Sequence, residues 1–242
     1  MPRATAAVLA LGLVAVSPAA GWASGLEARI GGFFPRAQSD LFSDDAELYL
    51  KEGRQNAVCA GVPCPGLRRR DWDGLYGGVE YSFNVARHVE MGLSIDGYGR
   101  EINTSYRDFT RPGDTEIFQT LKLTLVPVGL SLRVLPLDRF APVQPYVTVG
   151  GDVIFYQYEE FGDFIDFFSR NLDISSDSFK SDGAAFGGHA AAGLRVPVGH
   201  DFAITGEVRY QFAQKKQMGD DFRNNRLDLN GPSATLGVRL RF

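Results

Sequence analysis

Apolar and polar residues alternate with a period of two through much of this chain. The last twelve residues, GPSATLGVRLRF, show the pattern most clearly, because every second residue back from Phe242 is apolar while Arg239 and Arg241 lie between them. Successive side chains of a β-strand point to opposite faces of a sheet, so this alternation predicts a strand. We therefore expect the sequence to end on a strand with one apolar face and one charged face.

Eight segments follow this pattern. They are residues 26–34, 74–85, 89–98, 119–135, 144–156, 185–198, 201–212 and 231–242. In the fourth segment the apolar positions change from odd numbers up to Leu125 to even numbers from Val126 onward, next to Pro127. The change predicts either a β-bulge or a part of the strand that projects beyond the buried band.

The connections between these segments are alternately long and short. The long ones are residues 35–73, 99–118, 157–184 and 213–230. In an up-and-down meander every long connection lies at one end of the sheet. An even number of strands with short periplasmic turns and long extracellular loops is typical of outer-membrane barrels. We therefore predict an all-β fold over residues 24–242, an eight-stranded antiparallel up-and-down transmembrane β-barrel with extracellular loops.

The direction of the apolar faces separates two kinds of barrel. Apolar faces that point inward would indicate a soluble, ligand-holding barrel. Aromatic residues at both ends of the apolar faces instead favour contact with lipid, since they form two girdles. These aromatic residues are Phe34, Phe83, Phe155, Phe186, Phe202, Tyr210, Phe212 and Phe242.

Charged residues of both signs occupy the other face of the strands. An eight-stranded barrel has an interior only wide enough for side chains to fill, and arginine suits paired, partly desolvated carboxylates. We therefore predict lumenal ion pairs, with a proton or ion path as the alternative. The predicted members are Glu27, Arg29, Glu80, Glu90, Asp96, Arg133, Asp152, Arg195, Glu207, Arg209, Arg239 and Arg241.

The first 23 residues predict a secretory signal peptide. Arg3 precedes an apolar run from Ala6 to Val16, and small residues follow around a cleavage site near Ala23. The run is shorter than the roughly 20 residues that a membrane anchor needs. Export makes a disulfide between Cys59 and Cys64 the expected state of the two cysteines, with a free or reactive pair as the alternative.

Composition changes this picture little. The net charge is −4 and basic residues form no dense stripe, which argues against a nucleic-acid partner. We predict no cofactor and no metal site. His189 falls on the lumenal face, and neither it nor His88 and His200 in the short turns has a partnering serine at a supporting spacing, so no catalytic residue is predicted.

The chain resembles the small eight-stranded outer-membrane β-barrels of Gram-negative bacteria, the OmpA-like and OmpW-like group. The resemblance rests on the topology and on PYVTVGG at 145–151, GEVRYQF at 206–212 and LGVRLRF at 236–242. It implies a location in the outer membrane, contact with its lipid and lipopolysaccharide, and insertion by the barrel-assembly machinery, for which Phe242 would be part of the signal.

The same resemblance leaves the function open, because the group contains structural proteins, adhesins, narrow channels and lipid-A-modifying enzymes. We expect a structural or surface-interaction role carried by the loops, whose ligand is unknown, with the lumen plugged by ion pairs. A narrow pore for small or hydrophobic solutes is the alternative, and a lipid-A-modifying enzyme is the less favoured one. The basic run RRR at 68–70 is a candidate contact for lipopolysaccharide phosphates.

Overall fold

The computed structural model describes residues 24–35, 48–50, 69–138, 141–166, 169, 172–215, 218–222 and 226–242. The predicted signal peptide, residues 1–23, lies outside the described residues. So do Cys59 and Cys64, and their predicted disulfide therefore stays a prediction.

Eight antiparallel strands form a closed ring. In order around the ring they are β1 (Ser24–Phe33), β3 (Gly74–Ala86), β4 (Val89–Arg111), β5 (Thr115–Val134), β6 (Gln144–Ile165), β7 (Ile174–Val198), β8 (Phe202–Lys215) and β10 (Gly231–Arg241). The ring closes where β1 pairs with β10, with a register from Gly25 opposite Arg241 to Phe33 opposite Ser233. The predicted fold class is therefore confirmed.

Four short elements accompany the ring. Strand β2 (Leu48–Leu50) pairs with β4, and β9 (Leu227–Asp228) pairs with β8. The 3-10 helices are η1 (Arg69–Trp72) and η2 (Asp220–Phe222). Among the described residues, no helix has both the length and the apolar character needed to cross a membrane.

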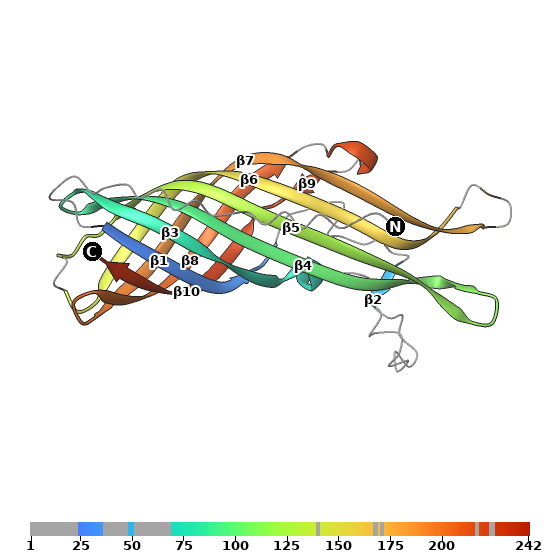
Figure 1. The fold of residues 1–242 in the computed structure, drawn as a ribbon, viewed down its shortest axis with the longest axis horizontal. Coiled ribbons are helices and arrows are strands. Elements are labelled where there is room, and N and C mark those ends of the chain that lie inside the picture. The colour runs from blue at the N-terminus through green and yellow to red at the C-terminus, as the bar shows by residue number, and fades with distance from the viewer. Residues whose placement is uncertain are drawn as a thin grey trace.

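The boundary between strand and loop differs from the prediction at two long connections. Residues 99–118 and 157–184 were expected to be loops, but β4 to β7 continue through most of them and leave only short tips at 112–114 and 166–173. Figure 1 shows the resulting hairpins, β4–β5 and β6–β7, reaching past the other strands at the end opposite the C-terminus. We call this part, residues 99–118 and 157–184, the extension.

The tip of the β4–β5 hairpin explains how so short a turn suffices. Gly113 and Asp114 have φ angles of 87° and 58°. The connection has three residues, 112–114, between the paired residues Arg111 and Thr115. Three-residue hairpin loops place a residue at positive φ, which glycine and aspartate tolerate better than other residues. The segment RPGDT therefore holds a tight turn inside what the hydrophobic pattern alone marks as a long loop.

The outer wall of the ring is apolar. Along β10, the exposed fractions of the outward side chains Leu236, Val238 and Leu240 are 69%, 54% and 39%, and Phe242, just after the strand, is 61% exposed. Aromatic side chains such as Phe186 and Phe202 are exposed by 80% and 52% on the same wall. Such a surface suits hydrocarbon rather than water, so the apolar faces of the strands point outward, as predicted.

Strand β5 explains the change of apolar parity near Pro127. Its register with β6 runs without a shift from Gln119 to Val134, so the predicted β-bulge is absent from this part of the described chain. Odd-numbered residues point inward along the whole strand. The apolar residues therefore change sides, from the outer wall near Leu130 to the interior at Leu123, where the strand enters the extension.

The interior consequently has two layers. Along β4, the inward residues Glu90, Ser94 and Asp96 are polar, and Tyr98 and Ile102, which follow them, are apolar or aromatic. The second layer is part of an apolar core that lies where the barrel meets the extension. This core includes Phe33, Trp72, Tyr76, Leu121, Leu123, Leu125, Ile154, Tyr156, Tyr158 and Phe222.

Candidate functional site

The polar layer of the lumen brings together charged side chains from all eight strands of the ring. Alternation along each strand points these side chains inward, and the closed ring forces them into one space. Each of them is at most 7% exposed. The members are Glu27, Arg29, Glu80, Glu90, Asp96, Arg133, Asp152, His189, Arg195, Glu207, Arg209 and Arg239.

Arg29 and Asp96 form one end of this network, next to the apolar core. The Arg29 guanidinium donates two hydrogen bonds to the Asp96 carboxylate, from Nε to Oδ1 over 2.9 Å and from Nη2 to Oδ2 over 2.7 Å. Its Nη1 also donates to Glu80 Oε2 over 3.2 Å. A two-pronged arginine–carboxylate pair of this kind is stronger and more directional than a single bond.

Arg133 lies at the centre of the network. Its Nη2 is 2.8 Å from Glu80 Oε1, and its Nη1 is 3.5 Å from Glu90 Oε2. The guanidinium carbon lies 4.5 Å from the centre of the Tyr146 ring, a cation–π distance. Arg133 is 1% exposed, so these partners replace nearly all of its contact with water.

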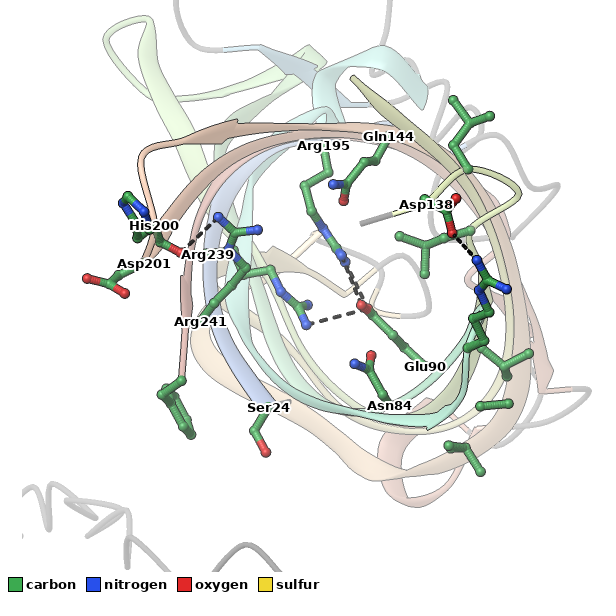
Figure 2. A pocket seen from close by; sticks show the side chains of 17 residues that line it. Ser24, Asn84, Glu90, Asp138, Gln144, Arg195, His200, Asp201, Arg239 and Arg241 are labelled. Atoms are coloured by element: carbon green, nitrogen blue, oxygen red, sulfur yellow. Dashed lines mark hydrogen bonds and ion pairs between the residues drawn. The ribbon is translucent and has the colours of Figure 1, made fainter. Parts of the chain in front are cut away.

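Glu90 marks the other end of the network, nearest the short turns. Arg195 donates to both of its oxygens, over 2.9 and 2.8 Å. Nη2 of Arg239 lies 3.4 Å from Glu90 Oε2. Figure 2 shows the two arginine side chains converging on Glu90 from different sides of the lumen.

The remaining contacts start from β8 and reach β4 and β1. Nε and Nη2 of Arg209 lie 3.1 and 3.0 Å from Glu207 Oε1, and its Nη1 lies 3.3 Å from Asp96 Oδ2. Thr205 donates from Oγ1 to Glu27 Oε1 over 2.9 Å. The five arginines and their five carboxylate partners thus form a continuous set of contacts across the barrel.

Two of the predicted site residues are placed differently from the prediction. Asp152 has His189 as its partner, with Oδ2 2.7 Å from Nδ1 of the imidazole, where an arginine was expected. Arg241 lies outside the network, which corrects its prediction. It donates from Nη2 to the carbonyl oxygens of Gly199 and His200. Arg241 ends β10, so its side chain meets the adjacent short turn.

Sequence reasoning missed the glycines that make room for this network. A Cβ added at Gly78 would lie 2.3 Å from Asp96 Oδ1, and one at Gly129 would lie 2.2 Å from Asp152 Oδ1. Both glycines occupy inward positions of the charged band. A glycine at an inward-facing position, on a strand whose other inward residues are charged, could have predicted this. It leaves space for a long charged side chain from a neighbouring strand.

Pairing is a physical requirement for charges in such a place. An isolated buried charge costs far more free energy than a paired and hydrogen-bonded one. The network therefore fills the lumen with charges that pair with one another, although some of its atoms, such as Nη1 of Arg133 and Nε of Arg239, have no hydrogen-bond partner. Among the described residues, no three histidine, cysteine or acidic side chains are grouped so that they could hold a metal ion.

Comparisons with known proteins agree with this geometry at the level of the family. A family model described as "Outer membrane protein beta-barrel domain" matches residues 6–242. A comparison with curated proteins found no match.

Similar solved structures each share 14% sequence identity with this chain over 91% of its length. They are the Neisserial surface protein A (TM-score 0.45, 96% of that chain), the N-terminal β-barrel domain of Pseudomonas aeruginosa OprF (0.36, 97%), and Ail, the attachment invasion locus protein of Yersinia pestis, in complex with the heparin analogue sucrose octasulfate (0.37, 98%).

Proposed function

Because the chain belongs to the outer membrane protein β-barrel family, and so lies in the outer membrane of a Gram-negative cell, we propose that it is a structural or surface-interaction protein. Its interactions would be made by the extension rather than through the lumen. The observation that carries the proposal is the filled interior, in which a charged layer and an apolar core follow one another along the barrel axis.

The charged layer supports a closed lumen because its members hold one another in place. Arg133 contacts carboxylates from two different strands, Glu80 and Glu90. The apolar core adds a second barrier, with Trp72 and Leu123 at 0% exposure. An ion would have to break buried ion pairs and then cross a dry apolar layer, and both steps are costly.

The extension supplies a surface that suits contact with a partner outside the cell. Its outward side chains include Phe118 and Phe161, exposed by 37% and 41%, together with Leu172 at the β6–β7 tip, exposed by 40%. Asp177 and Asp182 are exposed on the neighbouring part of β7. Aromatic residues and charge at the tips of a rigid scaffold are a common arrangement for binding.

Lipopolysaccharide is the partner we propose for the basic residues near η1. Arg69 and Arg70 lie in η1, and Arg100 donates from Nε to the carbonyl oxygen of Asp71 over 2.7 Å. This contact brings Arg100 beside η1 at the level where the barrel meets the extension. Clustered arginines would attract the phosphates of the outer leaflet.

Outer-membrane lipid is the partner we propose for a hollow in the outer wall. The hollow has a volume of about 930 Å³, and the side chains that line it include Ile30, Leu194 and Leu236. Gly206 lies between Leu236 and Leu194 in the strand register and adds no side chain there. The hollow would accept an acyl chain.

The test of a closed lumen is conductance in planar lipid bilayers. The proposal expects no discrete, reproducible openings for the purified protein. Reproducible openings would contradict it and would favour the second candidate function, a narrow pore for small solutes. The observation that favours a pore is the open cavity of about 860 Å³ at the short-turn end of the lumen.

The test of a surface role is labelling of intact cells. Asp114→Cys and Leu172→Cys, each in a C59S/C64S background, place one thiol at each hairpin tip. A membrane-impermeant maleimide is expected to label both variants on intact cells, whereas Asp201→Cys, in a short turn, is expected to react only after lysis. Labelling of Asp201→Cys alone on intact cells would place the extension on the periplasmic side.

Catalysis on lipid is less favoured. A hydrolase acting on a lipid would need a nucleophile with an adjacent base on the lipid-facing wall. His189 is buried inside the lumen, and His88 and His200 lie in the short turns. A change in the lipid A mass spectrum on deletion of the protein would revive this function.

A further inference from the structure

The lumen opens into a cavity at the end where the short turns lie. Its volume is about 860 Å³. Figure 2 looks into it and shows Glu90, Arg195, Arg239, Gln144 and Asn84 around the opening. The closed lumen depends on the layers beyond this cavity, so a ligand of the cavity would be compatible with it.

Arg239 has hydrogen-bond donors to spare in this cavity. The residue is 2% exposed. Its closest carboxylate contacts are Glu90 Oε2, 3.4 Å from Nη2, and Glu27 Oε2, 3.9 Å from Nη1. Its Nε and Nη1 have no hydrogen-bond partner. A buried donor on a charged group that lacks an acceptor is costly. Arg133 and Arg209 also carry such donors, but Arg239 and Arg195, whose Nε is likewise unpartnered, line the cavity, so their donors point to a ligand there.

Three arginines share one carboxylate at the inner end of the cavity. Arg133, Arg195 and Arg239 all lie within 3.5 Å of Glu90, and Arg133 and Arg239 also lie near Glu80 and Glu27. At the rim, Arg87 is paired with Asp138 over 3.1 Å. Low-dielectric walls strengthen the attraction of such guanidinium groups for an anion.

We propose that this cavity binds one phosphate-type oxyanion, with Arg239 as its main ligand and Arg195 beside it. A guanidinium is a strong charge-assisted donor to the oxygens of a phosphate or sulfate group. The anion enters from the short-turn side and accepts a hydrogen bond from one of the two unpartnered donors of Arg239, Nε or Nη1, which lie on different edges of the guanidinium. Inorganic phosphate and the phosphate of a lipid headgroup have this chemistry in common.

Gly25 gives a way to move Arg239 without changing any charge. A Cβ added at Gly25 would lie 2.6 Å from Nε and 2.7 Å from Nη2 of Arg239. The guanidinium therefore rests directly on the Gly25 backbone, and an alanine there displaces it. Gly25→Ala tests the position of the guanidinium, while Arg239→Gln tests its charge and its donors.

The experiment is a titration of the full chain in zwitterionic detergent with inorganic phosphate, at constant ionic strength set with chloride, followed by calorimetry. The wild-type chain is expected to show one saturable site, and R239Q is expected to bind about tenfold or more weakly because a charge-assisted hydrogen bond is lost. R87Q, which removes an exposed arginine from the rim, is the matched control and is expected to bind like wild type. Absence of saturable binding, or equal binding by R239Q and wild type, would overturn the proposal.

Two further variants test whether Arg239 binds the anion or only stabilises the fold. G25A is expected to weaken phosphate binding while the net charge stays the same. E90Q removes the carboxylate that competes with the anion, so it is expected to bind phosphate about fivefold more tightly. Phosphate should also raise the unfolding temperature of E90Q more than that of wild type. Weaker phosphate binding by E90Q would contradict the site even if R239Q failed to fold.

Nanodiscs distinguish the two sources of the anion. If the site holds a lipid phosphate, the apparent affinity for inorganic phosphate falls when anionic phosphatidylglycerol is included in the disc, because the lipid competes. If the site holds free phosphate, lipid composition leaves that affinity unchanged. R239Q removes the site in either case.

Discussion

Every base in the buried ion-pair network except His189 is an arginine, and its shape explains why. The guanidinium of Arg29 satisfies two carboxylates at once, and that of Arg133 meets Glu80 and Glu90 while its face lies on Tyr146. A lysine ammonium is a compact point charge that offers no planar fork or face. In a buried lumen, the number of directed donors decides how many carboxylate oxygens can be paired.

Arg133→Met tests the network at its centre. The change leaves Glu80 and Glu90 short of a buried partner, and breaking a buried pair in this way costs about 3–5 kcal/mol. We expect that loss in the free energy of unfolding, measured by urea titration of the protein in lipid vesicles with gel mobility as the readout.

The control for Arg133→Met is Arg87→Met. Arg87 and Asp138 form an exposed pair, with side chains 79% and 61% exposed, and such pairs contribute about 0–1 kcal/mol. Equal effects of the two substitutions would mean that the lumen is hydrated and that its ion pairs carry little of the stability.

Sequence reasoning reached most of these residues because parity alone places a side chain inside or outside a barrel. It erred at Arg241, since parity does not say where the wall ends. It paired Asp152 with the arginines, whereas register sets Asp152 near His189: Gly150, two residues before Asp152 on β6, lies opposite His189. Which inward residues meet depends on register and strand tilt, and neither can be read from alternation.

Strand β5 shows how one element serves two environments. The half nearer the short turns places Leu130 on the outer wall, 55% exposed, and Ser131 and Arg133 inside. The half nearer the extension instead points Leu121 and Leu123 into the apolar core. Odd-numbered residues point inward along the whole strand, so the direction of the side chains does not change. What changes is the face that carries apolar residues, because we expect hydrocarbon around the part with Leu130 and water around the part with Leu123.

Substitutions to arginine on the outer face of β5 test this division. Leu130→Arg places a charge in the lipid-facing band, and we expect it to destabilise the folded protein in vesicles by about 2–4 kcal/mol. Phe118→Arg lies on the same face of the same strand, within the extension, and is expected to cost about 0–1 kcal/mol. A large loss of stability for Phe118→Arg would indicate that the membrane extends to the tip of the hairpin.

The eight strands were predictable because the lipid-facing band demands strict alternation. The extension was not, because outside the membrane neither face must be uniformly apolar. Its outer face mixes Phe161 with polar residues such as Asp163, so the same strand reads as a loop. The sequence PGD indicates a tight turn at Gly113 and Asp114. It could not be assigned to a hairpin, because the alternating pattern of the two neighbouring segments stops before reaching it on either side.

The whole molecule is a closed barrel of unequal height. The strands β1, β3, β8 and β10 have 10 to 14 residues, whereas β4 to β7 have 20 to 25. A bilayer needs about 9–11 residues per strand. We expect the surplus to form a four-stranded wall beyond the membrane, with the apolar core at its base.

Phe242→Ala tests the predicted assembly signal at the scale of the whole barrel. If Phe242 is read by the assembly machinery, the substitution lowers the amount of folded barrel in cells, measured by heat-dependent gel mobility, but leaves refolding of the purified chain into detergent unchanged. Leu240→Ala, two residues earlier on the same face, is the control. An equal loss in both assays would make Phe242 a packing residue, in keeping with its contact with Tyr81, whose ring centre is 6.5 Å away.

The central claim is that apolar side chains face lipid and that the interior is closed to it. Quenching of tryptophan fluorescence by brominated lipids tests this claim most directly. In vesicles, Leu236→Trp in a W22F/W72F background is expected to be strongly quenched, while Trp72 in a W22F background, buried in the apolar core, is expected to keep its emission. Quenching of Trp72 with no quenching at position 236 would contradict the account.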